Sequence, residues 1–173
     1  MKLVIYLDMD GVLADLFGHL AWTHGVDHWK EIKEVEAALV QTWNTSFFYN
    51  ISPFENTQLI VDFVREQCDK HELRWGICSS PLRGDMYNSA YWKRRWLLEH
   101  DIHPNQENLI FTGNKHKYAV NRLTGKPNIL VDDKPSNVKA WIDAGGIAIR
   151  FQNDQDDLEE YLFQQLEDAI ELL

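Results

Sequence analysis

Two carboxylates separated by one residue follow the first apolar run of the chain, in the segment Asp-Met-Asp-Gly-Val at residues 8–12. Residues 2–7 predict a buried strand, because the run is short, β-branched and aromatic, and uncharged after its first residue. Side chains two positions apart on an extended chain point the same way, so Asp8 and Asp10 could share one cation and one phosphate. Gly11 permits the sharp turn that such an approach needs. A solvated turn is the alternative, since Asp-x-Asp-Gly is common where strands end.

Three later apolar runs, at residues 73–78, 108–111 and 128–131, also predict strands that end in polar residues, and residues 146–150 predict a fifth strand. The polar ends are Ser79-Ser80-Pro81, Thr112-Gly113-Asn114-Lys115 and Asp132-Asp133. Loops at the carboxyl ends of parallel strands meet in one crevice. We therefore expect carboxylates, hydroxyls, backbone N–H groups and an amine to gather there, and these groups bind a metal ion and phosphate.

Helical periodicity separates the predicted strands, over residues 12–22, 27–45, 56–68, 87–100, 115–122, 136–144 and 156–172. This alternation predicts an α/β fold with a doubly wound, mostly parallel sheet covered on both faces. About 65 residues separate the first two strands, whereas a simple crossover unit needs about 30. We expect residues 16–53 to form a small helical cap inserted after the first strand, and residues 1–15 and 54–173 to form the core.

The bulk properties indicate one soluble globular domain and do not exclude a small phosphorylated substrate. The 173 residues, 45% of them hydrophobic, are enough for one domain with a proper core. The net charge of −10 argues against nucleic-acid polymers and anionic membranes as partners. No run approaches the roughly 20 apolar residues of a membrane span, and no signal peptide is evident, so a cytoplasmic location is expected. Cys68 and Cys78 are expected to be reduced, buried thiols.

The order of these motifs resembles the four motifs of the haloacid dehalogenase-like hydrolases, and within them it is most similar to the 5′(3′)-deoxyribonucleotidases. The similar segments are Asp-Met-Asp-Gly-Val-Leu-Ala-Asp at 8–15, Phe-Phe-Tyr…Pro at 47–53, Ile-Cys-Ser-Ser-Pro-Leu-Arg at 77–83, Tyr-Trp-Lys at 91–93 and Leu-Val-Asp-Asp-Lys-Pro at 130–135. The resemblance implies a Mg²⁺-dependent phosphatase that removes phosphate from deoxyribonucleoside monophosphates through an aspartyl-phosphate.

The four carboxylates then take distinct roles. Asp8 is the candidate nucleophile, and Asp10 would protonate the leaving alkoxide and afterwards deprotonate the attacking water. Mg²⁺ prefers oxygen ligands and would be held by Asp8, the backbone carbonyl of Asp10 and one residue of the later pair. Spacing leaves Asp132 and Asp133 as alternatives for that third ligand, and the family pattern assigns Asp133.

Phosphate binding is assigned to residues that follow the second and third strands. Ser79, Ser80 and the adjacent backbone N–H groups would bind phosphate oxygens, and Lys115 would balance the charge of the phosphoryl group. Lys117 is the alternative to Lys115, although Lys115 matches the family pattern better. Arg83 could reach phosphate or base, or lie solvated on its loop.

Substrate choice is expected to lie in the aromatic residues of the insertion. A base stacked on an aromatic ring gains about 1–3 kcal/mol, and the resemblance implies that cap aromatics enclose the nucleobase. We expect Phe47 and Phe48 to contact the base, and Trp22 and Trp43 to form the core of the cap. Leu16 stands where relatives carry an aromatic residue, which leaves the base and sugar preference open.

Two other functions remain compatible with the sequence. One is hydrolysis of another small phosphomonoester such as a sugar phosphate, and the other is non-catalytic nucleotide binding on the same scaffold. The presence of both Asp8 and Asp10 argues against the second. The sequence leaves the oligomeric state open, a homodimer included.

Overall fold

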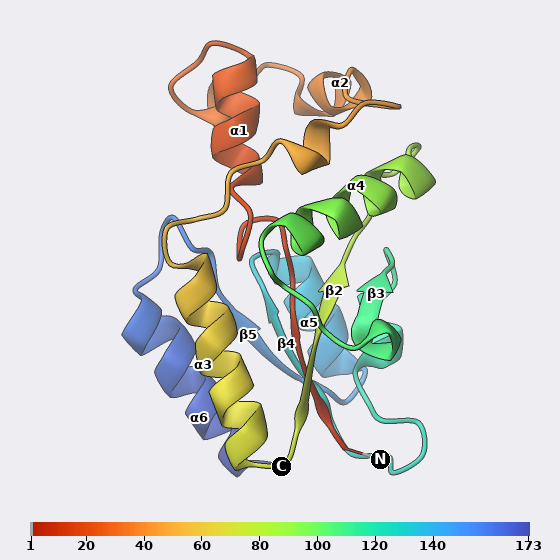
Figure 1. Ribbon diagram of the computed structural model, residues 1–173, viewed down its shortest axis with the longest axis vertical. Helices are drawn as coiled ribbons and strands as arrows, with labels where there is room; N and C mark the ends of the chain where they lie inside the picture. The colour runs from red at the N-terminus through yellow and green to blue at the C-terminus, as the bar shows by residue number, and fades with distance from the viewer. Residues whose placement is uncertain (1) are drawn as a thin grey trace.

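The computed structural model describes residues 2–173, which contain one five-stranded parallel sheet in the order β3-β2-β1-β4-β5 (Figure 1). The strands are β1 (Val4–Leu7), β2 (Arg74–Ser79), β3 (Leu109–Phe111), β4 (Ile129–Asp132) and β5 (Ile147–Arg150). From β1 the chain adds β2 and then β3 on one side, and it adds β4 and then β5 on the other side. Ligands bind at such a switch point in open α/β sheets, beyond the carboxyl ends of the strands.

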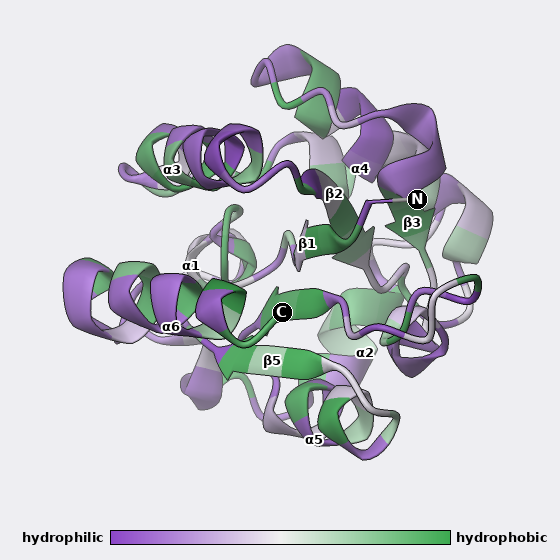
Figure 2. Cartoon of the chain, turned by 90° about the horizontal axis from the view of Figure 1, so that it is seen from below, coloured by the Kyte–Doolittle hydropathy of each residue, from purple (hydrophilic) through white to green (hydrophobic). Residues whose placement is uncertain are grey.

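Helices cover both faces of the sheet (Figure 2). They are α3 (Thr57–Lys70), α4 (Met86–Glu99) and α6 (Gln164–Glu171) on one face and α5 (Pro135–Asp143) on the other. Successive side chains of β1 alternate between the faces, so Ile5 packs in the cluster that includes Trp96 of α4, whereas Tyr6 packs against Trp141 of α5. The doubly wound α/β fold predicted from the sequence is confirmed.

The segment between β1 and α3 stands beyond the carboxyl ends of the strands, at the top of Figure 1. It contains α1 (Leu16–Thr23), α2 (Val35–Val40) and the 3₁₀ turns Trp29–Glu31 and Phe47–Tyr49. The chain leaves and re-enters the sheet side by side, because the Asp15 N–H donates to the Ser52 carbonyl at 2.9 Å and the Phe54 N–H donates to the Leu13 carbonyl at 3.1 Å. These bonds lie at the ends of the stretch 16–53 that we expected to form the cap, and we call that stretch the cap below.

The first helix begins later than the periodicity predicted, at Leu16 in place of residue 12. Residues 9–14 instead form a tight turn in which the N–H groups of Leu13 and Ala14 both donate to the Met9 carbonyl at 2.8 Å. Asp15 then caps the helix by accepting from the Gly18 N–H at 2.8 Å. The residues that follow the paired carboxylates therefore form this turn and not the first turn of the helix.

Three other helices are shorter than expected. The stretch 27–45 contains only a 3₁₀ turn and α2, in which Ala38 alone is buried, so it lacks the apolar face that would stabilise a long helix. The stretch 115–122 is a 3₁₀ turn over Lys115–Tyr118, because the chain then pairs Val120 with Pro127. The last helix opens with a π-helical turn, Glu159–Phe163, before α6. Within residues 2–173 no helix has the length and apolar character that crossing a membrane would require.

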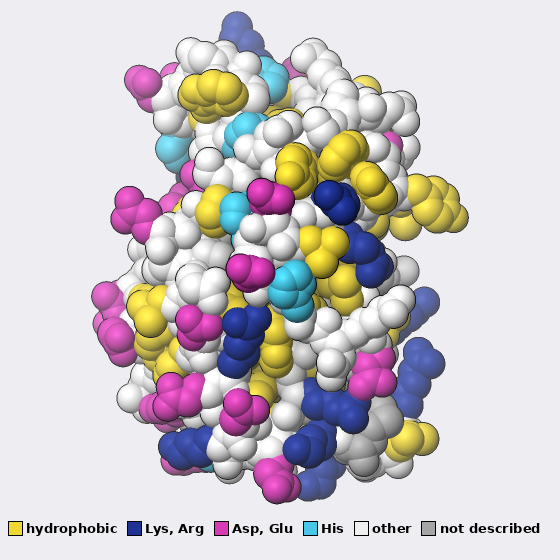
Figure 3. Space-filling model, viewed as in Figure 1, with side chains coloured by type: hydrophobic (Ala, Val, Ile, Leu, Met, Phe, Trp, Pro, Cys, Tyr) yellow, Lys and Arg dark blue, Asp and Glu magenta, His cyan; other side chains and the backbone are white. Residues whose placement is uncertain are grey.

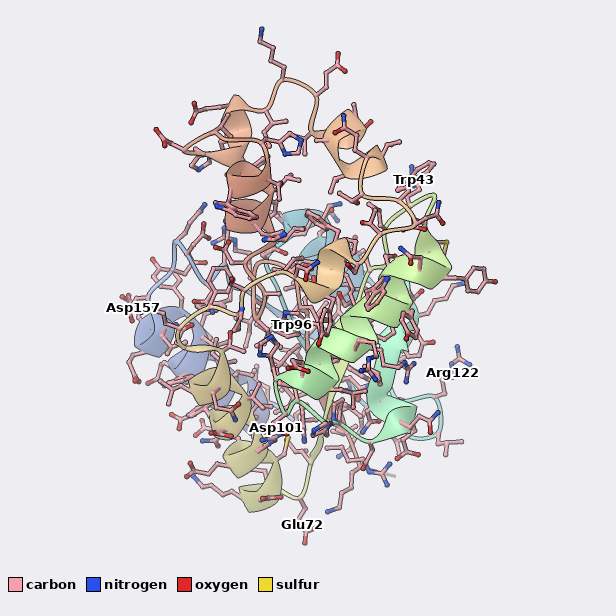
Figure 4. The ribbon with its side chains drawn as sticks, turned by 45° about the horizontal axis from the view of Figure 1, so that its top comes forward. Trp43, Glu72, Trp96, Asp101, Arg122 and Asp157 are labelled. Atoms are coloured by element: carbon pink, nitrogen blue, oxygen red, sulfur yellow. The ribbon has the colours of Figure 1, made fainter. Side chains whose placement is uncertain are left out.

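α4 joins the cap to the core through Trp96, which lies on the inner side of the helix in Figure 4. Trp96 is fully buried, and its indole N–H donates to the Ile51 carbonyl at 2.6 Å. One turn earlier, Trp92 packs against Tyr49 with ring centroids 5.7 Å apart. The cap segment 47–51 is therefore fixed to α4 by ring packing and by a buried hydrogen bond.

Replacing Trp96 with Phe should lower the free energy of unfolding by about 1–3 kcal/mol, because the Ile51 carbonyl loses its buried donor. Trp22→Phe is the matched control and should have little effect, since Trp22 is 75% exposed. Urea unfolding of the two variants checks the prediction, and equal midpoints would contradict it.

Candidate active site

Asp8 follows β1 and is almost fully buried. Its backbone N–H donates to the Val131 carbonyl of β4 at 2.9 Å, which continues the sheet register by one residue. One carboxylate oxygen, Oδ1, accepts from the Met9 N–H at 2.7 Å, and the other, Oδ2, lies 2.6 Å from the Lys115 ammonium. The carboxylate is thus held in a fixed orientation at the switch point.

Asp132 ends β4 and shares the same lysine. Its Oδ2 lies 2.6 Å from Lys115 Nζ, and its Oδ1 accepts from the Lys134 N–H at 2.9 Å. The amide of Asn137 donates to both oxygens at 3.1 Å. Because protein donors occupy both of its oxygens, Asp132 is suited to orienting Lys115.

Asp133 has a different environment, for its carboxylate takes part in no hydrogen bond or ion pair within residues 2–173. It lies against Gly11, whose φ is +77° and where a Cβ atom would stand 2.6 Å from Asp133 Oδ2. Oxygens of Asp8, Asp132 and Asp133 lie within 4.8 Å of one another. The absence of a side chain at Gly11 therefore lets the turn approach the carboxylate that remains free for a ligand.

This group of residues fits a divalent cation. Asp8, Asp10, Asp132 and Asp133 bring four carboxylates, whereas Lys93 and Lys115 bring two ammonium groups, so full ionisation leaves an excess of two negative charges. The free Asp133 carboxylate is a hard oxygen donor of the kind that Mg²⁺ prefers.

Asp10 is paired with a lysine of α4 that the sequence interpretation did not assign. Lys93 Nζ lies 2.5 Å from Asp10 Oδ2, and the lysine is fully buried. The other oxygen, Asp10 Oδ1, is buried without a hydrogen-bond partner within residues 2–173. An unpartnered buried oxygen is costly unless a ligand or water supplies the missing contact.

The two serines at the end of β2, Ser79 within the strand and Ser80 directly after it, differ in their accessibility to a ligand. Ser79 is fully buried, and its Oγ accepts from Lys93 Nζ at 3.0 Å. The backbone carbonyl of Ser80 accepts from the same ammonium at 2.8 Å, whereas the Ser80 side chain is half-buried. Ser80 therefore keeps its hydroxyl for a ligand, and Ser79 uses its oxygen to hold Lys93.

The remaining predicted binding residues are spread more widely. Lys117 and Arg83 are exposed, and within residues 2–173 neither forms an ion pair with the four carboxylates. Lys115, by contrast, contacts two of them. The structure thus distinguishes Lys115 from Lys117 by position, and it leaves Arg83 on the loop that follows β2.

The predicted aromatic residues divide into two groups. Phe47 and Phe48 are buried and pack edge to face, and the ring centroid of Phe48 lies 4.9 Å from Lys93 Nζ. The expectation that Trp22 packs in the cap core is wrong, because 75% of this residue is exposed. Trp43 is partly exposed and covers Gly84 at the start of α4, where Figure 4 labels it. Hydrophobic side chains accordingly show on the cap and over α4 in Figure 3.

Burial and mutual repulsion raise the carboxyl pKa values across the site. The pKa of Asp133 is raised to about 8 by burial and by the neighbouring carboxylates, with Asp8 the strongest. The pKa of Asp132 is raised to about 6 by burial and by Asp8, although Lys115 opposes this shift. The pKa of Asp10 is also raised, chiefly by burial, against the effect of Lys93. Burial alone would lower the pKa of Lys115, but Asp8 and Asp132 raise it above its ordinary value.

Sequence reasoning missed the roles of Lys93 and Asn153. On α4 the buried positions are Ser89, Lys93, Trp96 and Leu97, a helical stripe on which a lysine is out of place, and that signal could have identified Lys93. Asn153 donates from its side-chain amide to the Val12 carbonyl at 2.7 Å and from its N–H to the Gly11 carbonyl at 2.9 Å. It holds the turn after Asp10 from a loop 141 residues away in sequence, and no local pattern indicates this.

Comparison with known proteins supports the fold. Neither protein-family models nor curated protein sequences gave a match. Among solved structures, a HAD hydrolase of family IA, variant 3, from Entamoeba histolytica is similar with a TM-score of 0.55 at 15% identity, over 99% of both chains. A hydrolase from Pseudomonas syringae has a TM-score of 0.53 at 13% identity, over 95% of this chain and 90% of its own. A haloacid dehalogenase-like protein from Streptococcus pneumoniae has a TM-score of 0.51 at 12% identity, over 93% and 91%. The chain shares the fold of these hydrolases.

The pKa of Asp133 predicts how metal-free stability and metal binding depend on pH. An unfolded aspartate has a pKa of about 3.9, so between that pH and about 8 the folded protein keeps a proton that the unfolded chain releases. The contribution of this group to stability must therefore fall as the pH rises through that window. Because Mg²⁺ binds the ionised carboxylate, the stabilisation by Mg²⁺ should be larger at about pH 8.5 than at about pH 6.

Thermal unfolding with and without Mg²⁺ at both pH values measures this effect. Asp133→Asn should remove most of the Mg²⁺-dependent shift, whereas the control Asp143→Asn, at an exposed ion pair with Lys139, should retain it. A shift in the wild type that is equal at both pH values would contradict the prediction.

Proposed function

We propose that this protein is a Mg²⁺-dependent phosphatase that transfers the phosphoryl group of a small phosphomonoester to Asp8 and then to water. The observation that carries the proposal is the arrangement at the switch point. There Lys115 bridges Asp8 and Asp132, and Asp10 lies two residues from Asp8. Within residues 2–173 the Asp133 carboxylate has no protein partner, and Asp10 Oδ1 is buried without one.

In the first step the Asp8 carboxylate attacks phosphorus. As the new O–P bond forms, the bond from phosphorus to the ester oxygen breaks and its electron pair stays on that oxygen. Asp10 gives the proton on Oδ1 to the leaving oxygen, and its raised pKa favours the protonated form that this step needs. Lys115 remains charged beside Asp8 and offsets the negative charge of the phosphoryl group.

In the second step a water molecule displaces Asp8 from phosphorus. Asp10, now ionised, accepts the proton of this water, and the products are the free Asp8 carboxylate and inorganic phosphate. Mg²⁺, held by Asp8, Asp133 and the backbone carbonyl of Asp10, would supply positive charge next to the phosphate oxygens. Ser80 and the N–H groups of its loop would bind the same oxygens.

We further propose deoxyribonucleoside monophosphates as the substrates, and the aromatic rings of the cap support this choice. A hollow of about 510 Å³ lies between α1 and residues 45–50, with His19, Trp22 and Phe47 in its lining. Phe47 contacts both His19 and Phe48, so ring contacts connect the hollow to Lys93 beside Asp10. Flat rings of this kind stack on nucleobases with little sequence preference. Phe47 lines this hollow and Phe48 does not, which makes Phe47 the better candidate for direct base contact.

Asp8→Asn tests the nucleophile. The variant should lose phosphate release with every substrate by a factor on the order of 10⁴ or more, as expected when a covalent nucleophile is removed. The wild type, quenched in acid during turnover, should show the mass of a phosphorylated protein, and the variant should not. Asp143→Asn is the control and should retain full activity. Substantial turnover by Asp8→Asn would exclude the covalent mechanism.

A substrate panel tests the proposed specificity. With Mg²⁺ present, deoxyribonucleoside 5′- and 3′-monophosphates, ribonucleotides and sugar phosphates are compared by kcat/KM. Deoxynucleotides should have the highest kcat/KM. Phe47→Ala should lower kcat/KM for deoxynucleotides by about 5- to 100-fold, the loss expected for one stacking contact, and should change kcat/KM for sugar phosphates little. A strong preference for sugar phosphates would be consistent with the phosphatase mechanism but would overturn the assignment of nucleotides as the substrates.

A further inference from the structure

Lys93 is a buried cation whose hydrogen-bonding capacity is already used within the protein. Its ammonium donates to Asp10 Oδ2 at 2.5 Å, to the Ser80 carbonyl at 2.8 Å and to Ser79 Oγ at 3.0 Å. A lysine ammonium has three N–H donors. No donor is therefore left for a substrate, and Lys93 acts on the site only through the residues that it holds.

The contact with Asp10 distinguishes the two oxygens of that carboxylate. Lys93 binds Oδ2, whereas Oδ1 is buried and has no partner within residues 2–173. A free carboxylate could rotate and exchange its oxygens, but a charge-assisted bond of this length opposes that rotation. The ion pair thus determines which oxygen is directed away from α4.

The cap contributes to holding the ammonium in place. The ring of Phe48 lies 4.9 Å from Lys93 Nζ, within the range of a cation–π contact. The residues next to Lys93 on α4 bind the same cap segment, since Trp92 packs on Tyr49 and Trp96 donates to Ile51. The position of Lys93 therefore depends on the contact between α4 and the cap.

We propose that Lys93 is a positioning residue, which holds Asp10 so that Oδ1 faces the leaving oxygen of the substrate, with Phe48 of the cap keeping its ammonium in place. The proposal rests on the proposed function, in which Asp10 gives a proton to that oxygen as the bond to phosphorus breaks. Lys93 is not consumed and does not bind phosphate. Loss of Lys93 should therefore slow the departure of a leaving group that must be protonated. It should have little effect on the departure of a leaving group that needs no proton.

The test compares two classes of phosphomonoester in single-turnover experiments with Mg²⁺. Alkyl esters such as a deoxynucleotide release a basic alkoxide that needs a proton, whereas p-nitrophenyl phosphate releases a stabilised phenolate. Lys93→Met, which keeps the chain length and removes all donors, should slow alcohol release from the alkyl ester by about 10²- to 10⁴-fold, the usual contribution of general acid catalysis. Release of p-nitrophenol should fall by less than about tenfold.

Asp10→Asn provides the reference. It should produce the same selective loss, and the double variant should be no slower than Asp10→Asn alone, because both changes remove one function. Lys139→Met, at an exposed lysine, is the matched control and should leave both rates unchanged. The proposal would be overturned if Lys93→Met slowed both esters equally or left both rates unchanged. It would also be overturned if the rate losses of the two single variants added in the double variant.

Phe48→Leu is a second test that keeps Lys93 and does not depend on the folding of Lys93→Met. Loss of the ring should slow the alkyl ester by about 2- to 10-fold, in keeping with one cation–π contact, with a smaller effect on p-nitrophenyl phosphate. Equal slowing of both esters would count against the proposal. Turnover by Asp8→Asn would instead contradict the phosphatase mechanism itself, so the two failures are distinguishable.

Discussion

Two lysine side chains are buried among the carboxylates beyond the carboxyl ends of the strands, and the rest of the site depends on their pairing. Lys115 is 2% exposed and joins Asp8 to Asp132, and Lys93 is fully buried against Asp10. An unpaired buried charge is strongly destabilising, so each of these two buried lysines needs a carboxylate partner. The excess of acids over lysines leaves Asp133 for a cation.

This charge cluster also connects the cap to the core. The turn after Asp8 passes directly into α1, and α4 carries Lys93 between the cap ring Phe48 and the two serines at the end of β2. Asn153 holds the same turn from the loop after β5. Lys93 of α4 thus holds the Asp10 carboxylate, and Asn153 holds the backbone of the turn that follows it. Because Phe48 of the cap lies beside Lys93, the cap is connected to Asp10 through α4.

The fold and the strand-end residues could be predicted because they depend on local patterns. Short apolar runs alternating with helical periodicity require a layered α/β structure, and the strands found begin and end within one or two residues of the predicted ones. The helices of the cap were predicted less well, since α2 and its neighbouring turns bury few side chains and gain little from packing. The assignment of Trp22 to the core failed for a related reason, because helical spacing does not show which face is covered in a small insertion.

The sequence by itself determined the succession of strands and helices along the chain and placed Asp8, Asp10, Lys115 and the pair Asp132-Asp133 where predicted strands end, since apolar runs and helical periodicity are local patterns. Tertiary structure decided which of these groups contact one another. It brought Lys115 and not Lys117 to the carboxylates, and it brought Lys93 to Asp10 across 83 residues of sequence. It also gave Asp132 hydrogen-bond partners on both oxygens, whereas the Asp133 carboxylate has none within residues 2–173. Such choices depend on the burial of charge between distant segments, where each ion must find a partner, and no local pattern records them.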